Sequence, residues 1–122
     1  MPINLKVKTK LENYPIIIGS NLISKLNFYL NRESIFFNQC LLVIDKNVPK
    51  KMISKISKSL KRNKVHKFIF KASEENKNII SVRRVLQILL NKNFSRQDCL
   101  ITIGGGITGD VGGFAASLYK RG

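Results

Sequence analysis

A strand-like apolar run that stops at three consecutive glycines is the feature that most constrains this fold. The run is Cys99–Ile103, the glycines occupy 104–106, and an apolar helix is expected to open behind them over 111–119. Glycine lets the backbone approach a ligand closely and adopts positive φ without strain. Between a strand and a helix, such a turn directs free N–H groups toward an anion, aided by the helix dipole. The stretch predicts a phosphate or pyrophosphate site, and therefore suggests a nucleotide.

The rest of the chain alternates apolar runs of strand length with segments whose apolar residues recur at helical spacing. Ser20, Pro49 and Asn78 each stand where a helix can begin. The first strand is expected to be half-buried and to pair with the second as a hairpin. The alternation predicts an α/β fold: an N-terminal hairpin, then a mostly parallel, Rossmann-like sheet flanked by helices. The expected strands cover residues 3–9, 14–18, 40–44, 65–70 and 99–103.

Three predicted strand ends carry residues suited to ligand binding. Ligands bind beyond the carboxyl ends of parallel strands, so these ends are expected on one rim of the sheet. Asp45 and Asn47 suit hydrogen bonds to ribose hydroxyls, or are ordinary turn residues. Glu74 and Lys77, in the next loop, are otherwise an i, i+3 surface pair. Asp110 is expected near the start of the last helix, where it caps free N–H groups or bonds a cofactor hydroxyl.

The glycines themselves allow two interpretations. Gly104, Gly106 and Gly109 satisfy the GxGxxG dinucleotide fingerprint in a strand–turn–helix context. The acidic residue that usually follows about 20 positions later lies beyond the chain. The alternative is a tight turn that needs glycine only for packing. Gly112 and Gly113 fall inside the expected helix, where close packing against a neighbour is the expected role.

Composition narrows the class of protein. The chain has 22 Lys and Arg against 7 Asp and Glu, a net charge of +15. No recognised basic–aromatic module accompanies this charge, which argues against nucleic-acid binding as the main role. No apolar run approaches the ~20 residues of a membrane span, and no signal-peptide block is seen, so a cytoplasmic protein is expected. Cys40 and Cys99 are expected to be buried free thiols. His66 is expected at a surface or edge, and one histidine cannot form a multi-histidine metal site.

The C-terminal segment 104–122 resembles the GGGxxGDxxGFxAxxYxRG signature of the 3-dehydroquinate synthase family. The resemblance extends upstream: residues 14–19 are similar to the family's second strand, and 43–48 to its first nucleotide-contacting strand end. Glu74-x-x-Lys77 is similar to the family's GExxK loop, although Ser73 stands where the family has glycine. The resemblance therefore covers essentially the whole chain.

The resemblance implies a carbon–oxygen lyase of aromatic amino acid biosynthesis. Its substrate is a phosphorylated sugar acid, 3-deoxy-D-arabino-heptulosonate 7-phosphate, and its products are 3-dehydroquinate and phosphate. NAD would oxidise one carbinol transiently, with a divalent metal, zinc or cobalt, polarising oxygens. Arg121 would reach the substrate phosphate from the neighbouring subunit of a homodimer. The residues that the resemblance assigns to NAD are Asp45, Asn47, Glu74, Lys77, Gly105, Gly106, Ile107, Thr108, Gly109 and Asp110.

The family's metal ligands and catalytic lysines would lie beyond Gly122. We therefore expect residues 1–122 to be an N-terminal NAD-binding domain without the C-terminal metal-binding helical domain. Such a fragment contains no catalytic or metal-binding residue and is expected to be inactive alone. The alternative enzymes are a related sugar-phosphate cyclase or a metal-dependent alcohol dehydrogenase, which share the glycine-rich turn. A basic nucleic-acid-binding module is the more distant alternative.

Overall fold

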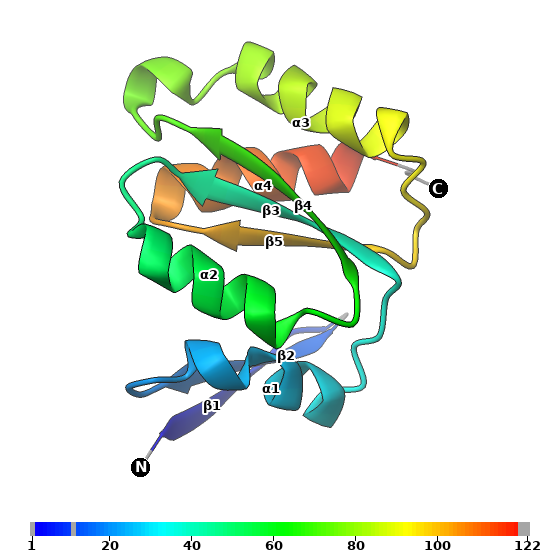
Figure 1. The fold of residues 1–122 in the computed structure, drawn as a ribbon. Coiled ribbons are helices and arrows are strands. Elements are labelled where there is room, and N and C mark those ends of the chain that lie inside the picture. The colour runs from blue at the N-terminus through cyan, green and yellow to red at the C-terminus, as the bar shows by residue number, and fades with distance from the viewer. Residues whose placement is uncertain (1, 11, 120–122) are drawn as a thin grey trace.

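The computed structural model describes residues 2–10 and 12–119. Its main sheet is parallel, with β3 (Gln39–Asp45) between β4 (Lys64–Phe70) and β5 (Cys99–Ile103) (Figure 1). Residues 40–44 of β3 are 0% exposed. A continuous apolar run is what a parallel strand covered on both faces requires, so the expected α/β fold is confirmed.

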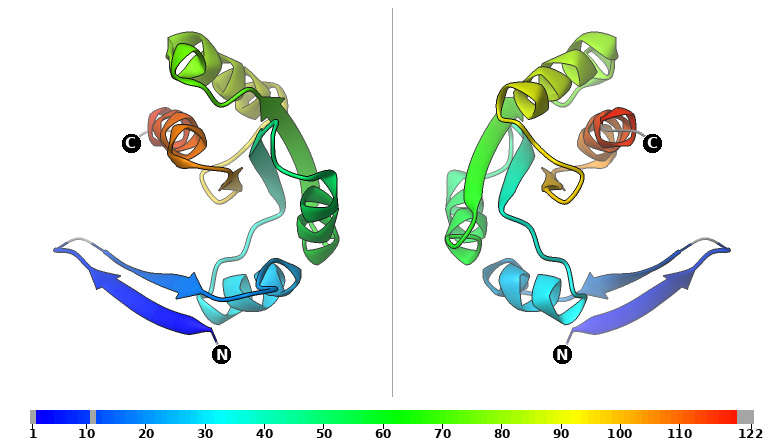
Figure 2. Two further views of the ribbon diagram at one scale, coloured as in Figure 1. Left: turned by 90° about the vertical axis from the view of Figure 1, so that its left-hand side faces the viewer. Right: turned by 90° about the vertical axis from the view of Figure 1, so that its right-hand side faces the viewer.

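Helices cover the two faces of this sheet unequally (Figure 2). On one face, α2 (Lys50–Ser59) packs Ile53 and Ile56 against the even-numbered residues of β3. On the other face lie α3 (Ile79–Asn91) and α4 (Gly106–Leu118), which pack against the odd-numbered residues. Because successive side chains of a strand point to opposite faces, β3 contributes fully buried side chains to both cores.

The N-terminal hairpin stands apart from the sheet. Strands β1 (Ile3–Lys8) and β2 (Asn13–Ile18) pair antiparallel, as expected, and Figure 2 shows them projecting to one side. The expectation of half-burial is wrong for Ile3 and Leu5, which are 56% and 49% exposed. No described element packs over that apolar face of the hairpin.

The helix starts follow the predictions in part. Asn78 caps α3, because its side chain accepts a hydrogen bond from the Ser81 N–H at 3.0 Å. Ser20 caps nothing: a 3₁₀ turn, η1 (Ile23–Lys25), leads into α1 (Leu26–Arg32), and neither has a side-chain cap. The loop before α3 contains a second 3₁₀ turn, η2 (Glu74–Asn76), where only irregular backbone was expected.

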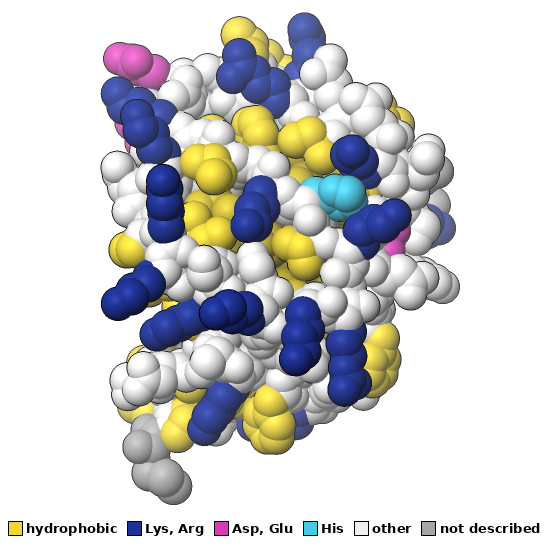
Figure 3. Space-filling model, viewed as in Figure 1, with side chains coloured by type: hydrophobic (Ala, Val, Ile, Leu, Met, Phe, Trp, Pro, Cys, Tyr) yellow, Lys and Arg dark blue, Asp and Glu magenta, His cyan; other side chains and the backbone are white. Residues whose placement is uncertain are grey.

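Lys and Arg side chains dominate the surface over α2 and β4, with few acidic side chains among them (Figure 3). Among the described residues, no helix has both the length and the apolar character needed to cross a membrane.

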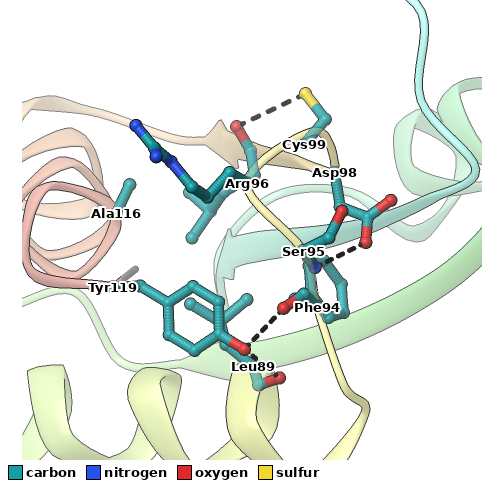
Figure 4. Close-up of a pocket in the computed structure, with 9 residues that line it drawn as sticks. Leu89, Phe94, Ser95, Arg96, Asp98, Cys99, Ala116 and Tyr119 are labelled. Atoms are coloured by element: carbon teal, nitrogen blue, oxygen red, sulfur yellow. Dashed lines mark hydrogen bonds between the residues drawn. The ribbon is translucent and has the colours of Figure 1, made fainter. Parts of the chain in front are cut away.

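The end of α4 is tied to the end of α3 by one hydroxyl group. The Tyr119 Oη lies 3.0 Å from the carbonyl oxygen of Leu89 and 2.7 Å from that of Phe94 (Figure 4). The Leu89 carbonyl belongs to α3 and also accepts the Phe94 N–H at 3.0 Å, whereas the Phe94 carbonyl lies in the loop that follows the helix. The Tyr119 hydroxyl therefore closes the core between α3 and α4 at the edge opposite the glycine turn.

Two neighbouring glycines of α4 give a matched test of its packing. A Cβ at Gly112 would lie 2.3 Å from Thr102 Cγ2, whereas a Cβ at Gly113 meets nothing within 4 Å. We expect Gly112→Ala to lower the free energy of unfolding by about 1–3 kcal/mol through overpacking. Gly113→Ala should raise it by up to about 1 kcal/mol through helix propensity. Urea denaturation of both variants measures the difference, and equal effects would contradict this packing.

Candidate functional site

The carboxyl ends of β3, β4 and β5 lie side by side because the three strands are parallel and in register. The Lys46 N–H donates to the Phe70 carbonyl at 2.8 Å and ties the first two ends together. This rim therefore brings together Asp45 and Asn47, the loop that contains Glu74 and Lys77, and the glycine turn. The sequence prediction that these three segments share one rim is confirmed.

Glycine is required at the first position of the turn. Gly104 has φ +149°, and a Cβ there would lie 2.6 Å from Thr108 Oγ1 and 2.9 Å from Asp45 Cβ. Gly105 and Gly106 differ, because a Cβ on either would meet nothing within 4 Å. The turn is therefore closed on the side of the sheet and open toward solvent.

Helix α4 begins earlier than the sequence suggested. It starts at Gly106, with Gly105 as its N-cap and no side-chain cap. The N–H groups of the first turn, residues 105–108, have no partner within the helix and face the open side of the turn. Asp110 consequently lies in the second turn, so the expectation that it caps the helix is wrong. The glycines themselves supply the helix start, since Gly109 already donates to the Gly105 carbonyl at 3.1 Å.

Asp110 instead forms an ion pair with Lys77. The Lys77 Nζ lies 2.9 Å from Asp110 Oδ2, and both side chains are about half exposed. The hydrogen bond and charge of Asp110, and then the charge of Glu74, raise the pKa of Lys77. Lys77 therefore pairs across to α4 and not with Glu74, which was the pair suggested by sequence spacing.

Two buried hydroxyls at the rim lack partners. Thr108 is 0% exposed, and its Oγ1 forms no hydrogen bond within the described structure. Ser73 Oγ, in the adjacent loop, is likewise buried without a partner. Buried polar atoms are ordinarily satisfied, and the only other such orphan among the described residues is Ser57 Oγ on α2. Asp45 is partly committed, since its Oδ1 accepts the Asn47 N–H at 3.2 Å.

An apolar hollow adjoins the ion pair between α3 and α4. Lys77 and Asp110 stand at its edge, and Ile79, Val82 and Phe114 line it. Phe114 is 51% and Ile79 is 60% exposed. Sequence analysis did not single out these two residues, because an apolar residue on a helix is ordinarily assigned to the core.

Four other residues that the sequence analysis considered are not among those described at the rim. Cys40 and Cys99 are free thiols, the first buried and the second partly buried. Burial raises the pKa of Cys40 to about 12 and that of Cys99 to about 11, so both thiols are protonated at neutral pH. His66 lies on the edge strand β4, and its Nε2 is 3.1 Å from Gln39 Oε1. Arg121, the predicted substrate-phosphate ligand, lies outside the described residues.

Comparison with known proteins first defines the class of fold. A crystal structure of 2-deoxy-scyllo-inosose synthase, complexed with carbaglucose-6-phosphate, NAD+ and Co2+, superposes with a TM-score of 0.86 at 23% identity, covering 98% of this chain and 32% of that one. The chain therefore has the fold found in one portion of that synthase.

The sequence comparisons are more specific. Residues 67–122 match the family model described as 3-dehydroquinate synthase N-terminal. A 3-dehydroquinate synthase of Pelagibacter ubique (strain HTCC1062) is 58% identical over 98% of this chain and 33% of its own length. That of Bartonella quintana (strain Toulouse) is 34% identical over 95% of this chain and 32% of its own length. The predicted resemblance to the 3-dehydroquinate synthase family is confirmed, and the chain spans about a third of the length of these relatives.

The Lys77–Asp110 ion pair can be tested by titrating the Lys77 side chain. Because Asp110 is the largest cause of the raised pKa of Lys77, Asp110→Asn should lower that pKa more than Glu74→Gln does. Because the pKa of Lys77 is raised, the ion pair stabilises the folded chain at every pH below the ordinary pKa of lysine. This stabilisation is lost as the pH rises through the raised pKa of Lys77. NMR titration of the Lys77 side chain measures both shifts, and a larger effect of Glu74→Gln would contradict the assigned pairing.

Proposed function

We propose that residues 1–122 form the NAD-binding domain of a 3-dehydroquinate synthase. The observation that best supports this proposal is the open, uncapped start of α4 at Gly105 and Gly106, beside the ends of two parallel strands. A pyrophosphate fits such a site, since it accepts backbone N–H bonds and is favoured by the helix dipole. The 58% identity to the Pelagibacter enzyme supports this choice over a related sugar-phosphate cyclase.

The rim residues suit the other parts of NAD. Asp45 and Asn47 present hydrogen-bonding groups for the adenosine ribose at the end of β3. Lys77 offers a cation near the phosphates, while Glu74 helps to hold the nucleotide. Asp110, neutralised by Lys77 at 2.9 Å, accepts from a ribose hydroxyl or an amide without repelling the phosphates.

The helix start contributes mainly through its backbone. Gly105, Gly106 and Ile107 line the pyrophosphate, and their N–H groups do the binding. Thr108 is 0% exposed, so its contribution is its N–H and the position of its hydroxyl under the turn. Gly109 faces open space, since a Cβ there would meet nothing within 4 Å, and the missing side chain leaves that space free for the nucleotide.

In the whole enzyme, bound NAD supplies transient oxidation of one carbinol of the substrate, 3-deoxy-D-arabino-heptulosonate 7-phosphate. The role of this chain is to hold the nucleotide and fix its orientation. The described residues bring together no three His, Cys, Asp or Glu side chains, so none of them is assigned to the divalent metal. We assign that metal, zinc or cobalt, to a following helical domain.

Two further properties belong to this proposal. Arg121 reaches the phosphate of the substrate from the neighbouring subunit of a homodimer, a task that bidentate guanidinium geometry suits. The enzyme acts in the cytoplasm as part of the shikimate pathway.

A side chain added at Gly105 should block the nucleotide without disturbing the fold. Gly105 has φ −89° and open space around its Cβ position, so valine is accommodated there. We expect Gly105→Val to weaken NAD binding at least tenfold in a calorimetric titration, with an unchanged melting temperature. Gly113→Ala, on the same helix away from the rim, should bind NAD like the parent chain. Unchanged affinity of Gly105→Val, or no NAD binding by the parent chain at millimolar concentration, would count against the site.

A chimera tests the whole activity. Residues 1–122 should replace the matching N-terminal part of the Pelagibacter enzyme, to which they are 58% identical, and support phosphate release from the sugar-acid phosphate with added zinc. The Gly105→Val chimera should lose that activity. A folded chimera that binds NAD but releases no phosphate would contradict the assigned reaction while leaving the nucleotide site intact.

A further inference from the structure

The basic residues of this chain are concentrated in one segment. Residues 46–73 contain ten Lys and Arg and no Asp or Glu. All ten are exposed, and neither ion pair found among the described residues involves any of them. We call this set the basic face: Lys46, Lys50, Lys51, Lys55, Lys58, Lys61, Arg62, Lys64, Lys67 and Lys71.

The basic face covers α2 and β4, and Figure 3 shows it as a field of one sign across the front of the molecule. Lys51, Lys55 and Lys58 recur at i, i+4 and i+7 along α2, so they form one row with ~6 Å and ~4.5 Å between levels. Lys51 and Lys55 line a hollow where α2 meets η1. Such a row suits successive phosphates of an extended polyanion.

Aromatic and amide groups gather beyond the end of α2. A second hollow, which we call the α1–α2 hollow, lies where α1 and the loop after it meet the turn after α2, and its lining includes Asn27, Asn31, Phe36, Arg62 and Asn63. Phe36 is 70% exposed, so its ring is open to a ligand. A ring beside a cation and the amides of Asn27 and Asn31 can stack a base and hydrogen-bond its edge, whereas the Asn63 amide donates to the Phe37 carbonyl.

Helix α1 also carries aromatic side chains and a cation near the α1–α2 hollow. Phe28 is 59% exposed and packs edge-on against Tyr29. The Arg32 guanidinium lies 4.9 Å from the centroid of the Tyr29 ring. Exposed rings thus follow the cations of α2, as at sites that bind single strands, while Arg32 is itself paired with Glu33 at 3.5 Å.

We propose that the lysine row on α2 and the α1–α2 hollow bind single-stranded RNA, away from the nucleotide site at the rim, where only Lys46 and Lys71 of the basic face directly follow strand ends. Phosphates follow the row on α2, and one base stacks on Phe36 in the α1–α2 hollow. A duplex cannot offer this base face, because its bases are stacked within the helix. An anionic membrane fits less well, because the apolar side of α2 is buried, with Ile53 at 8% and Ile56 at 5% exposure.

The first test separates position from net charge. Binding of a labelled 12-nucleotide single-stranded RNA is measured by fluorescence anisotropy across a salt series. The triple variant Lys51→Gln, Lys55→Gln, Arg62→Gln should bind at least tenfold more weakly at low salt, with a log–log salt slope reduced by about 2. The control Lys6→Gln, Lys8→Gln, Lys10→Gln, on the hairpin, has the same net charge and should change affinity less than twofold. Equal losses in the two variants, or no binding by the parent chain, would overturn the proposal.

The second test addresses stacking. Phe36→Leu keeps an apolar group but removes the ring, and it should weaken RNA binding between about fivefold and a hundredfold. Phe36→Tyr should restore it, and Gly105→Val should leave it unchanged. An RNA duplex of equal length should bind more weakly than the single strand. Unchanged binding by Phe36→Leu, or tighter binding to the duplex or to phosphatidylglycerol vesicles, would refute the stacking site.

Discussion

The structure depends on the burial of one strand. Residues 40–44 of β3 are 0% exposed, and both neighbouring strands run parallel to it. Its odd-numbered side chains enter the core beneath α3 and α4, and its even-numbered ones enter the core beneath α2. Because every strand of the sheet is registered on β3, three carboxyl ends reach the same rim. Hydrophobic burial of five residues thus places the polar groups of the candidate nucleotide site.

Close packing of α4 on β5 sets the geometry of that rim. Gly112 permits the approach, since a Cβ there would lie 2.3 Å from Thr102 Cγ2. Gly104 turns the chain directly against Asp45 and Thr108, which any side chain would prevent. These two glycines are therefore structural, whereas Gly105 and Gly106 face open space and are free to meet a ligand. The glycines of this segment look alike in the sequence, but the structure separates them into packing positions and positions open to a ligand.

The two proposed binding regions use charge in different ways. At the rim, Lys77 is paired with Asp110, and backbone N–H groups carry the selectivity. On α2 the cations have no acidic partner in the ion pairs described, and their field extends into solvent (Figure 3). The first arrangement suits a small ligand held at fixed points, and the second suits a long polyanion whose affinity varies with salt.

The sequence by itself determined the α/β class, the order of the elements, the strand over 99–103 and the shared rim, because hydrophobic periodicity and parallel topology leave few alternatives. It did not predict that α4 begins at Gly106 or that Lys77 pairs with Asp110, since helix starts and ion pairs depend on neighbours distant in the chain. Nor could it show that Phe36 and Arg62 share a hollow, because only tertiary packing brings the loop after α1 beside the turn after α2. Local pattern decides which elements form, and tertiary packing decides which side chains meet.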